Sequence, residues 1–150
     1  MKIIEIKTDR KKYLDLLLLA DEQESMIDRY LEAGTMYALS DPDVRAVCVV
    51  TDNGDGTLEI KNIAVAPEYQ HSGLGKEMIR FIEDRYRDSH NTLIVGTGDS
   101  ELTIPFYKKC GFEEAYRVKN FFTDNYDHPI IECGKQLIDM VYLKKEIRRI

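Results

Sequence analysis

The chain has 150 residues, of which 43% are hydrophobic and 32% are charged, and its formal net charge is −6. This length suits a single domain over residues 1–150 that buries about two thirds of its unfolded surface, and the composition excludes a disordered chain. The acidic charge, without a basic stripe carrying aromatic residues, argues against nucleic-acid binding and fits a cationic substrate better. The most apolar run, residues 14–20, is far too short to cross a bilayer, so we expect no membrane association.

The three cysteines carry no recognisable metal or redox motif. Cys48, Cys110 and Cys133 show neither a C-x-x-C pair nor the spacing of metal ligands. An odd number of cysteines, in a sequence that begins without a signal peptide, indicates reduced thiols and a cytoplasmic location. We therefore expect no metal cofactor.

Hydrophobic periodicity and turn residues predict a mixed α/β arrangement without an internal repeat. The predicted elements, in order, are a strand at 2–6, helices at 10–20 and 21–33, strands at 35–39, 44–51 and 57–66, a helix at 73–87, a strand at 91–95, a helix at 100–110 and strands at 112–122 and 136–145. Asn53-Gly54-Asp55-Gly56 predicts a tight hairpin between the strands at 44–51 and 57–66.

Two of these elements carry expectations about packing. In the second helix, Met26, Ile27, Tyr30 and Leu31 form one apolar stripe, which is typical of a helix packed on a sheet. The last strand alternates poorly, which suggests burial on both faces and a homodimer contact.

The most informative stretch joins a β-branched strand, ending at Pro67, to a polar loop with Gly73 and Gly75 and then to a helix. Unpaired N–H groups and the positive end of the helix dipole predict an anion site there, most often for phosphate. Glu77 stands where a Walker loop needs a hydroxyl residue, and Met78 where a dinucleotide fingerprint needs its third glycine. Both of these phosphate loops are therefore excluded.

The remaining pattern, Gln70-x-x-Gly73-x-Gly75 after a strand, resembles the pyrophosphate loop of the GNAT superfamily of acyl-CoA-dependent N-acyltransferases. The order of the predicted elements is similar to that of the superfamily, so the resemblance spans nearly the whole chain. It implies an α/β fold in which a mixed, mostly antiparallel, twisted sheet of six or seven strands is flanked by about four helices.

A second segment, residues 100–112, resembles the family pattern Asn-x-x-Ala-x-x-x-Tyr-x-x-x-Gly-Phe. The resemblance implies that Tyr107 is the acid that protonates the departing thiolate. A phenol with an ordinary pKa of about 10 stays protonated at neutral pH and can donate to a thiolate whose conjugate acid has a pKa of about 8.5. Ser100 and Thr103 depart from the pattern, and Pro105 is expected to bend the helix just before the tyrosine.

The resemblance also implies that acetyl-CoA binds as co-substrate. A bulge in the strand is implied to free the N–H of Val65 for the thioester carbonyl, where it would stabilise the oxyanion. Because Pro67 cannot donate a hydrogen bond, we expect strand pairing to fail close to it. The implied acetyl-CoA contacts are Ile63, Ala64, Val65, Gln70, His71, Ser72, Gly73, Leu74, Gly75, Lys76, Ser100 and Tyr107.

Acidic residues supply the candidates for a base and for substrate attraction. Glu59 resembles the position of the glutamate base in histone-acetylating members of the superfamily, although a mid-strand glutamate is often only a solvated side chain. Asp21, Glu22, Glu24 and Asp28 could draw in a cationic acceptor or could form a solvated helix face.

These features predict an N-acetyltransferase in which a primary amine of a small molecule or protein attacks acetyl-CoA directly in a ternary complex. Tyr107 and Glu59 are the predicted catalytic residues. The alternative is the same fold kept as a non-catalytic acyl-CoA sensor or protein-interaction module. Replacement of Tyr107 by phenylalanine separates the two, because it slows an enzyme and leaves a sensor unchanged.

Overall fold

The computed structural model of the chain describes residues 1–148. Its strands are β1 (Lys2–Ile6), β2 (Thr35–Ser40), β3 (Val44–Gly54), β4 (Thr57–Val65), β5 (Thr92–Gly98), β6 (Glu113–Val118), β7 (Ile131–Glu132), β8 (Lys135–Gln136) and β9 (Met140–Glu146). Seven of them form one sheet in the order β1-β2-β3-β4-β5-β9-β6, and β7 and β8 form a separate small hairpin. Only β4 and β5 pair in parallel within the large sheet.

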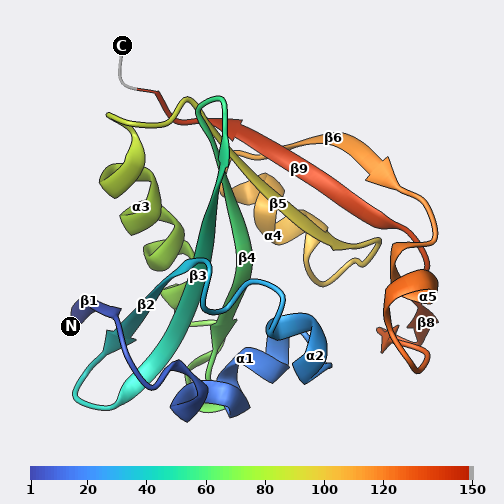
Figure 1. The fold of residues 1–150 in the computed structure, drawn as a ribbon, viewed down its shortest axis with the longest axis horizontal. Helices are drawn as coiled ribbons and strands as arrows, with labels where there is room; N and C mark the ends of the chain where they lie inside the picture. The colour runs from blue at the N-terminus through green and yellow to red at the C-terminus, as the bar shows by residue number, and fades with distance from the viewer. Residues whose placement is uncertain (149–150) are drawn as a thin grey trace.

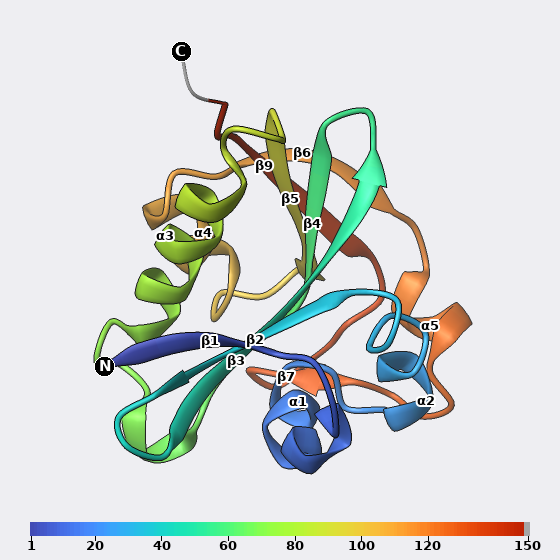
Figure 2. The ribbon, with the colours of Figure 1, turned by 60° about the vertical axis from the view of Figure 1, so that its left-hand side comes forward.

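Helices cover both faces of this sheet (Figures 1 and 2). They are the 3₁₀ helices η1 (Arg10–Tyr13) and η2 (Pro67–Tyr69) and the α-helices α1 (Leu14–Ala20), α2 (Glu24–Ile27), α3 (Leu74–Tyr86), α4 (Ile104–Lys109) and α5 (Phe121–Asn125). The predicted fold class is confirmed. No helix within residues 1–148 is long and apolar enough to cross a membrane.

Alternation along the central strand β3 divides the core into two layers. Ala46, Cys48 and Val50 are buried in the larger cluster with the apolar face of α3, whereas Val47 and Val49 are buried in the cluster with α1. This period of two is what a strand covered on both faces requires. The side chains of β3 therefore support both helical layers at once.

The sheet opens between β4 and β5. Their parallel pairing runs from Thr57↔Thr92 only to Ile60↔Val95, although β5 continues to Gly98 and stays paired with β9. On its other edge, β4 remains paired with β3 up to Ala46↔Val65. Figure 1 shows β4 and β5 diverging beyond this short paired region. The rest of β4 thus has one edge that no strand covers.

Two predicted helices are shorter than their patterns suggest. The second helix ends as α2 at Ile27, and turns continue the chain to Gly34. The turns keep helix-like backbone bonds, such as Leu31 N–H to the Ile27 carbonyl, and the guanidinium of the buried Arg10 donates to the carbonyl oxygens of Leu31 and Gly34 at their end. The predicted apolar stripe is nevertheless buried.

The predicted helix 100–110 begins only at Ile104 as α4. Pro105 lies in its first turn, where a missing N–H costs nothing, so the expected bend before Tyr107 is wrong. The predicted strand 112–122 ends as β6 at Val118, because Asn120 adopts a left-handed conformation with φ 57° and opens α5.

Candidate active site

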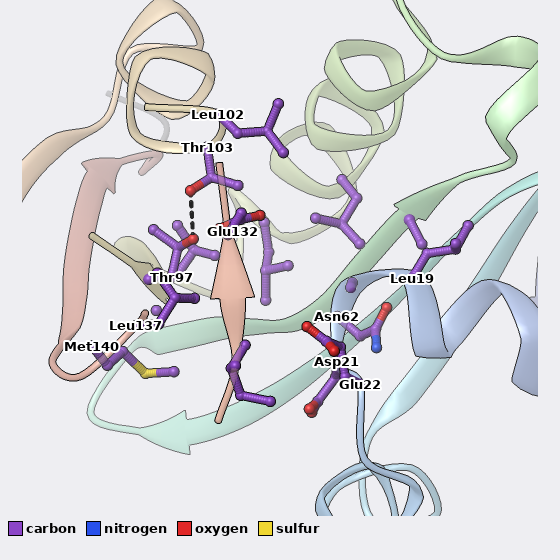
Figure 3. A pocket seen from close by; sticks show the side chains of 18 of the residues that line it. Leu19, Asp21, Glu22, Asn62, Thr97, Leu102, Thr103, Glu132, Leu137 and Met140 are labelled. Atoms are coloured by element: carbon purple, nitrogen blue, oxygen red, sulfur yellow. Dashed lines mark hydrogen bonds between the residues drawn. The ribbon is translucent and has the colours of Figure 1, made fainter. Parts of the chain in front are cut away.

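A cavity of about 290 Å³ lies where β4 and β5 diverge. Its walls come from the end of α1 and the residues after it, the unpaired part of β4, the end of β5, the start of α4, and the segment from α5 to β9. Figure 3 shows Asp21 and Asn62 on one wall of the cavity, with Thr97 and Thr103 on the other. Segments far apart in the sequence therefore converge on one space.

The β4 wall offers backbone hydrogen-bond donors. The N–H of Ala66 donates to the Arg45 carbonyl at 2.8 Å, toward β3, so the alternation of a strand turns the N–H groups of Val65 and Ile63 toward the gap. The predicted contact Ala64 lines the cavity, but its backbone pairs with β3. The side-chain amide of Gln70 donates to the Val65 carbonyl at 3.0 Å and so holds the loop against this wall.

The bulge in β4 lies deeper than we predicted. The register with β3 shifts between Ile60 and Asn62, which leaves Lys61 as the extra residue, and β3 pairing continues past Val65. The bond from Ala66 is the last of this pairing, since β4 ends at Val65 and η2 begins at Pro67, so the expectation that pairing fails close to Pro67 is confirmed. The free edge arises because β5 departs, and the bulge turns Asn62 toward the α1 layer while Ile60 belongs to the α3 layer.

The predicted phosphate loop leads directly into α3. Gly73 precedes the helix with φ 87° and caps it without a side-chain hydrogen bond, and the Glu77 N–H is bonded to the Gly73 carbonyl. The preceding amides of the first turn have no partner within the helix. A Cβ on Gly75 would lie 3.1 Å from the Phe106 ring, so this glycine permits close packing of the loop on α4.

The other predicted loop residues divide between surface and core. His71, Ser72 and Lys76 are exposed, whereas Leu74 is buried. The Ser72 hydroxyl donates to the Tyr69 carbonyl. These exposed side chains lie next to the unpaired amides of the first turn of α3. The hydrogen-bond donors of the loop are therefore its backbone N–H groups.

Tyr107 is buried from solvent at the cavity wall, with 6% of its surface exposed. Its ring packs edge-on against Phe106 and Phe112 at centroid distances of 5.1 and 5.7 Å. Its hydroxyl makes no hydrogen bond to another residue in the described chain, and burial raises the pKa of the phenol. The tyrosine is thus fixed in place, protonated and free to donate.

Ser100 does not line this cavity, although we predicted it there. Its hydroxyl oxygen accepts the Leu102 N–H at 3.0 Å and supports the turn that leads to α4. The cavity instead presents Thr97, whose hydroxyl donates to that of Thr103 at 2.7 Å, as Figure 3 shows. Sequence reasoning missed Thr97, for which the only signal is a hydroxyl near the end of a strand.

Glu59, the predicted base, also lies outside the residues that line the cavity. It precedes the bulge, is 7% exposed, and accepts hydrogen bonds from Asn53 at 2.8 Å, Lys61 at 3.2 Å and Tyr142 at 3.1 Å. These three donors hold the carboxylate beside the paired part of β4.

A different carboxylate lies at the cavity. Asp21 accepts hydrogen bonds from the Tyr30 hydroxyl at 2.9 Å and the Tyr126 hydroxyl at 2.5 Å, and Asn62 donates to the same Tyr30 hydroxyl at 3.1 Å. Burial raises the pKa of Asp21, while the two tyrosine hydrogen bonds and the charge of Lys61 oppose that rise. No motif joins these residues in the sequence, so only the fold reveals them.

No group of three or more histidine, cysteine, aspartate or glutamate residues within 1–148 is arranged to hold a metal ion. The functional groups at this site are the N-terminus of α3, the two unpaired backbone N–H groups of β4, the Tyr107 phenol and the half-buried Asp21 carboxylate. Such a set suits the binding of an anionic cofactor and the activation of a carbonyl group.

Comparison with known proteins identifies the family. A family profile described as an acetyltransferase (GNAT) domain matches residues 32–114. The Bacillus subtilis protein YvbK, described as an uncharacterized N-acetyltransferase, is 39% identical over 132 residues, which cover 86% of this chain and 85% of YvbK.

Solved structures agree with this assignment. A GNAT family acetyltransferase from Elizabethkingia anophelis with acetyl-CoA bound superposes with a TM-score of 0.91 at 34% identity, and the match covers 97% of both chains. A Bacillus subtilis acetyltransferase in complex with CoA gives a TM-score of 0.87 at 34% identity, again over 97% of both chains. This chain therefore belongs to the GNAT family and is an acetyltransferase.

Proposed function

We propose that this acetyltransferase takes the acetyl group from acetyl-CoA and transfers it to a primary amine that attacks directly in a ternary complex. The observation that carries the proposal is the divergence of β4 from β5, which leaves the N–H groups of Ile63 and Val65 unpaired beside Tyr107 and the start of α3. The relatives with acetyl-CoA or CoA bound support the choice of acetyl donor.

The start of α3 fits the pyrophosphate of acetyl-CoA. Its first-turn amides lack both helical and side-chain partners, and residues 70–76 surround them. The exposed Lys76 adds a positive charge near these amides. We assign Gln70 a positioning role, because its side chain holds Val65 and leaves the loop backbone to bind the phosphates.

The unpaired edge of β4 fits the extended pantetheine arm and the thioester. An arm of this kind can hydrogen-bond to a free strand edge as an added strand would. Val65 remains our predicted donor to the thioester carbonyl, and Ile63, also a predicted contact, has its N–H turned to the same free edge. A donor of this kind typically lowers the barrier by about 2.7–4 kcal/mol.

Tyr107 is placed to protonate the thiolate as it leaves. A phenol is protonated at neutral pH, and Tyr107, whose hydroxyl has no other partner in residues 1–148, lines the cavity that Val65 also lines. The acceptor is proposed to be cationic, since Asp21, Glu22 and Glu132 line the cavity. That the protein forms a homodimer and does not bind nucleic acid remain predictions.

The test combines binding with turnover. Calorimetric titration with acetyl-CoA is followed by a thiol-release assay with 1,4-diaminobutane, spermidine, an aminoglycoside and a lysine-containing peptide as acceptors. We expect saturable acetyl-CoA binding and thiol release that depends on one class of amine. Binding without release for any amine would contradict the transferase activity, and a loss of binding would contradict the assignment of residues 70–76.

A further inference from the structure

One corner of the cavity contains hydrogen-bond acceptors to which no cation is bonded within residues 1–148. Asp21 is half-buried, and its side-chain hydrogen bonds come from the neutral hydroxyls of Tyr30 and Tyr126. Lys61 favours the ionised form of Asp21, but its ion pair is formed with Glu59. Within residues 1–148, Asp21 is therefore a carboxylate at the cavity with no ion-pair partner.

The neighbouring Asn62 contributes a second acceptor. This side chain is 3% exposed and lines the same cavity, and its Oδ1 is buried without a hydrogen-bond partner. Its Nδ2 donates to the Leu17 carbonyl at 3.0 Å and to the Tyr30 hydroxyl. A buried acceptor left in this way is unfavourable unless a donor reaches it.

The orientation of the Asn62 amide is fixed by these contacts. Exchanging its oxygen and nitrogen would set Oδ1 against the Leu17 carbonyl, so that two acceptors would face each other without a proton between them. Oδ1 therefore stays the unpaired atom. Asp21 and Asn62 both line the cavity and both bond to the Tyr30 hydroxyl. A carboxylate and an amide oxygen in one cavity match a group with several N–H donors and a positive charge, which describes a primary ammonium.

The corner lies next to the reacting centre. Asn62 directly precedes Ile63, whose N–H faces the gap where the thioester carbonyl is proposed to bind. Glu59 lies on the far side of the bulge with its carboxylate bonded to three donors. Glu59 is thus a carboxylate outside the cavity, whereas Asp21 lines it.

We infer that the acceptor binds as an ammonium between Asp21 and Asn62, and that Asp21 is the base that removes its proton before attack. The inference rests on the proposed acetyl transfer. Tyr30 and Tyr126 act as positioning residues, because they hold the Asp21 carboxylate from two segments that are 96 positions apart in the sequence (126 − 30).

The protons and electrons balance as follows. An N–H bond of the ammonium breaks as an O–H bond forms on Asp21, and the released lone pair forms the new C–N bond at the thioester carbon. The C–S bond breaks, its electron pair leaves on sulfur, and Tyr107 donates its proton there. The nitrogen gives its surplus proton to the Tyr107 phenolate, and Asp21 releases its proton to water.

Asp21→Asn tests the base directly, with Asp15→Asn as its control, since Asp15 is an exposed carboxylate on the same helical segment. With 1,4-diaminobutane we expect kcat to fall about 100-fold or more in Asp21→Asn, with the acid limb of the pH profile lost. With 2,2,2-trifluoroethylamine, which is largely unprotonated at neutral pH, the same variant should lose little. Asp15→Asn should match the wild type with both amines.

Binding supplies a readout that does not need turnover. 1,4-Diaminobutane is titrated by calorimetry into the protein saturated with CoA, and Asp21→Asn should weaken its affinity about tenfold or more while acetyl-CoA affinity stays unchanged. The unchanged acetyl-CoA affinity shows that the variant is folded.

Tyr126→Phe separates positioning from a merely structural role. Loss of its hydrogen bond removes a contact that lowers the pKa of Asp21, so the acid limb should move to higher pH. The groups that face Asp21 are Tyr30, Tyr126 and Lys61, and Lys61 is unchanged in this variant. A structural role alone would lower kcat at every pH without moving the limb.

The inference is overturned if Asp21→Asn keeps both the acid limb and the affinity for 1,4-diaminobutane, or if Glu59→Gln removes the limb instead. The absence of thiol release by the wild type with every amine would contradict the proposed function. In that case the titration of the CoA complex still reports whether Asp21 binds the ammonium.

Discussion

The two halves of the cleft are built from different parts of the chain. The proposed donor half consists of the free edge of β4, the loop at residues 70–76 and Tyr107, and the hydrogen-bond donors that it offers are mainly backbone amides within one short stretch. The acceptor half consists of Asp21, Tyr30, Asn62 and Tyr126, whose side chains come from segments up to 105 residues apart.

This difference determines how strongly each half constrains the amino-acid sequence. Backbone donors demand a defined path of the chain, such as the left-handed Gly73 at the start of α3, so the donor half constrains residue types at fixed spacing. A side-chain site needs only that a few atoms meet, and segments outside the β4–α3 unit can supply them. The acceptor can thus change while the donor half keeps its form.

The largest effect should come from Tyr107→Phe, which removes the acid of the donor half and leaves its backbone donors in place. We expect kcat to fall about 100-fold or more, because general acid catalysis typically contributes a factor of this size. Acetyl-CoA affinity should stay nearly constant, since the aromatic ring keeps its contacts with Phe106 and Phe112. Thiol-release kinetics and calorimetry measure the two quantities, and an unchanged kcat would assign proton donation to another group.

A smaller effect is expected from Gly73→Ala, which tests the backbone path itself. An alanine at φ 87° is strained by about 1–2 kcal/mol, so acetyl-CoA affinity should fall roughly tenfold while kcat at saturation holds. Gly54→Ala is the matched control, because Gly54 has φ 85° and, like Gly73, open space around its Cβ position, but lies in the β3–β4 hairpin. Equal losses of acetyl-CoA affinity in both variants would show that residues 70–76 have no special role.

The donor half was easier to predict from the sequence than the acceptor half, because its residues lie close together in the chain. The loop and Tyr107 follow from residues that are close in the chain; Gln70 and Tyr107 both line the cavity, and the rest of the loop leads into α3 outside its lining. The contact of the distant Arg10 with the carbonyls of Leu31 and Gly34 could not be predicted, because no local pattern signals it. The position of Ser100 follows from a local turn that replaces the first turn of the predicted helix.

The acceptor half escaped prediction because its residues share no motif. Asp21 was only one acid among several on the surface of a predicted helix, and Tyr30 belonged to an apolar stripe. Asn62 acquires its direction from the bulge at Lys61, which no residue type in the sequence signals. Glu59 is predicted as the base from its position on β4. It precedes the bulge at Lys61, and it is not among the residues that line the cavity.

The smallest effect concerns stability and contrasts the two halves again. Burial raises the pKa of both Tyr107 and Asp21, because it disfavours the charged form of each group in the folded protein. Since the folded pKa of Asp21 lies above its unfolded value of about 3.9, its contribution to the free energy of unfolding is favourable at low pH and is lost as pH rises through the folded pKa. Asp21→Asn should therefore raise Tm at pH 7 and lose that advantage near the unfolded pKa, whereas Asp15→Asn should show no such pH dependence. A variant that gains stability as it loses activity would show that Asp21 serves the chemistry of the cleft and not its folding, and a lower Tm at pH 7 would contradict this.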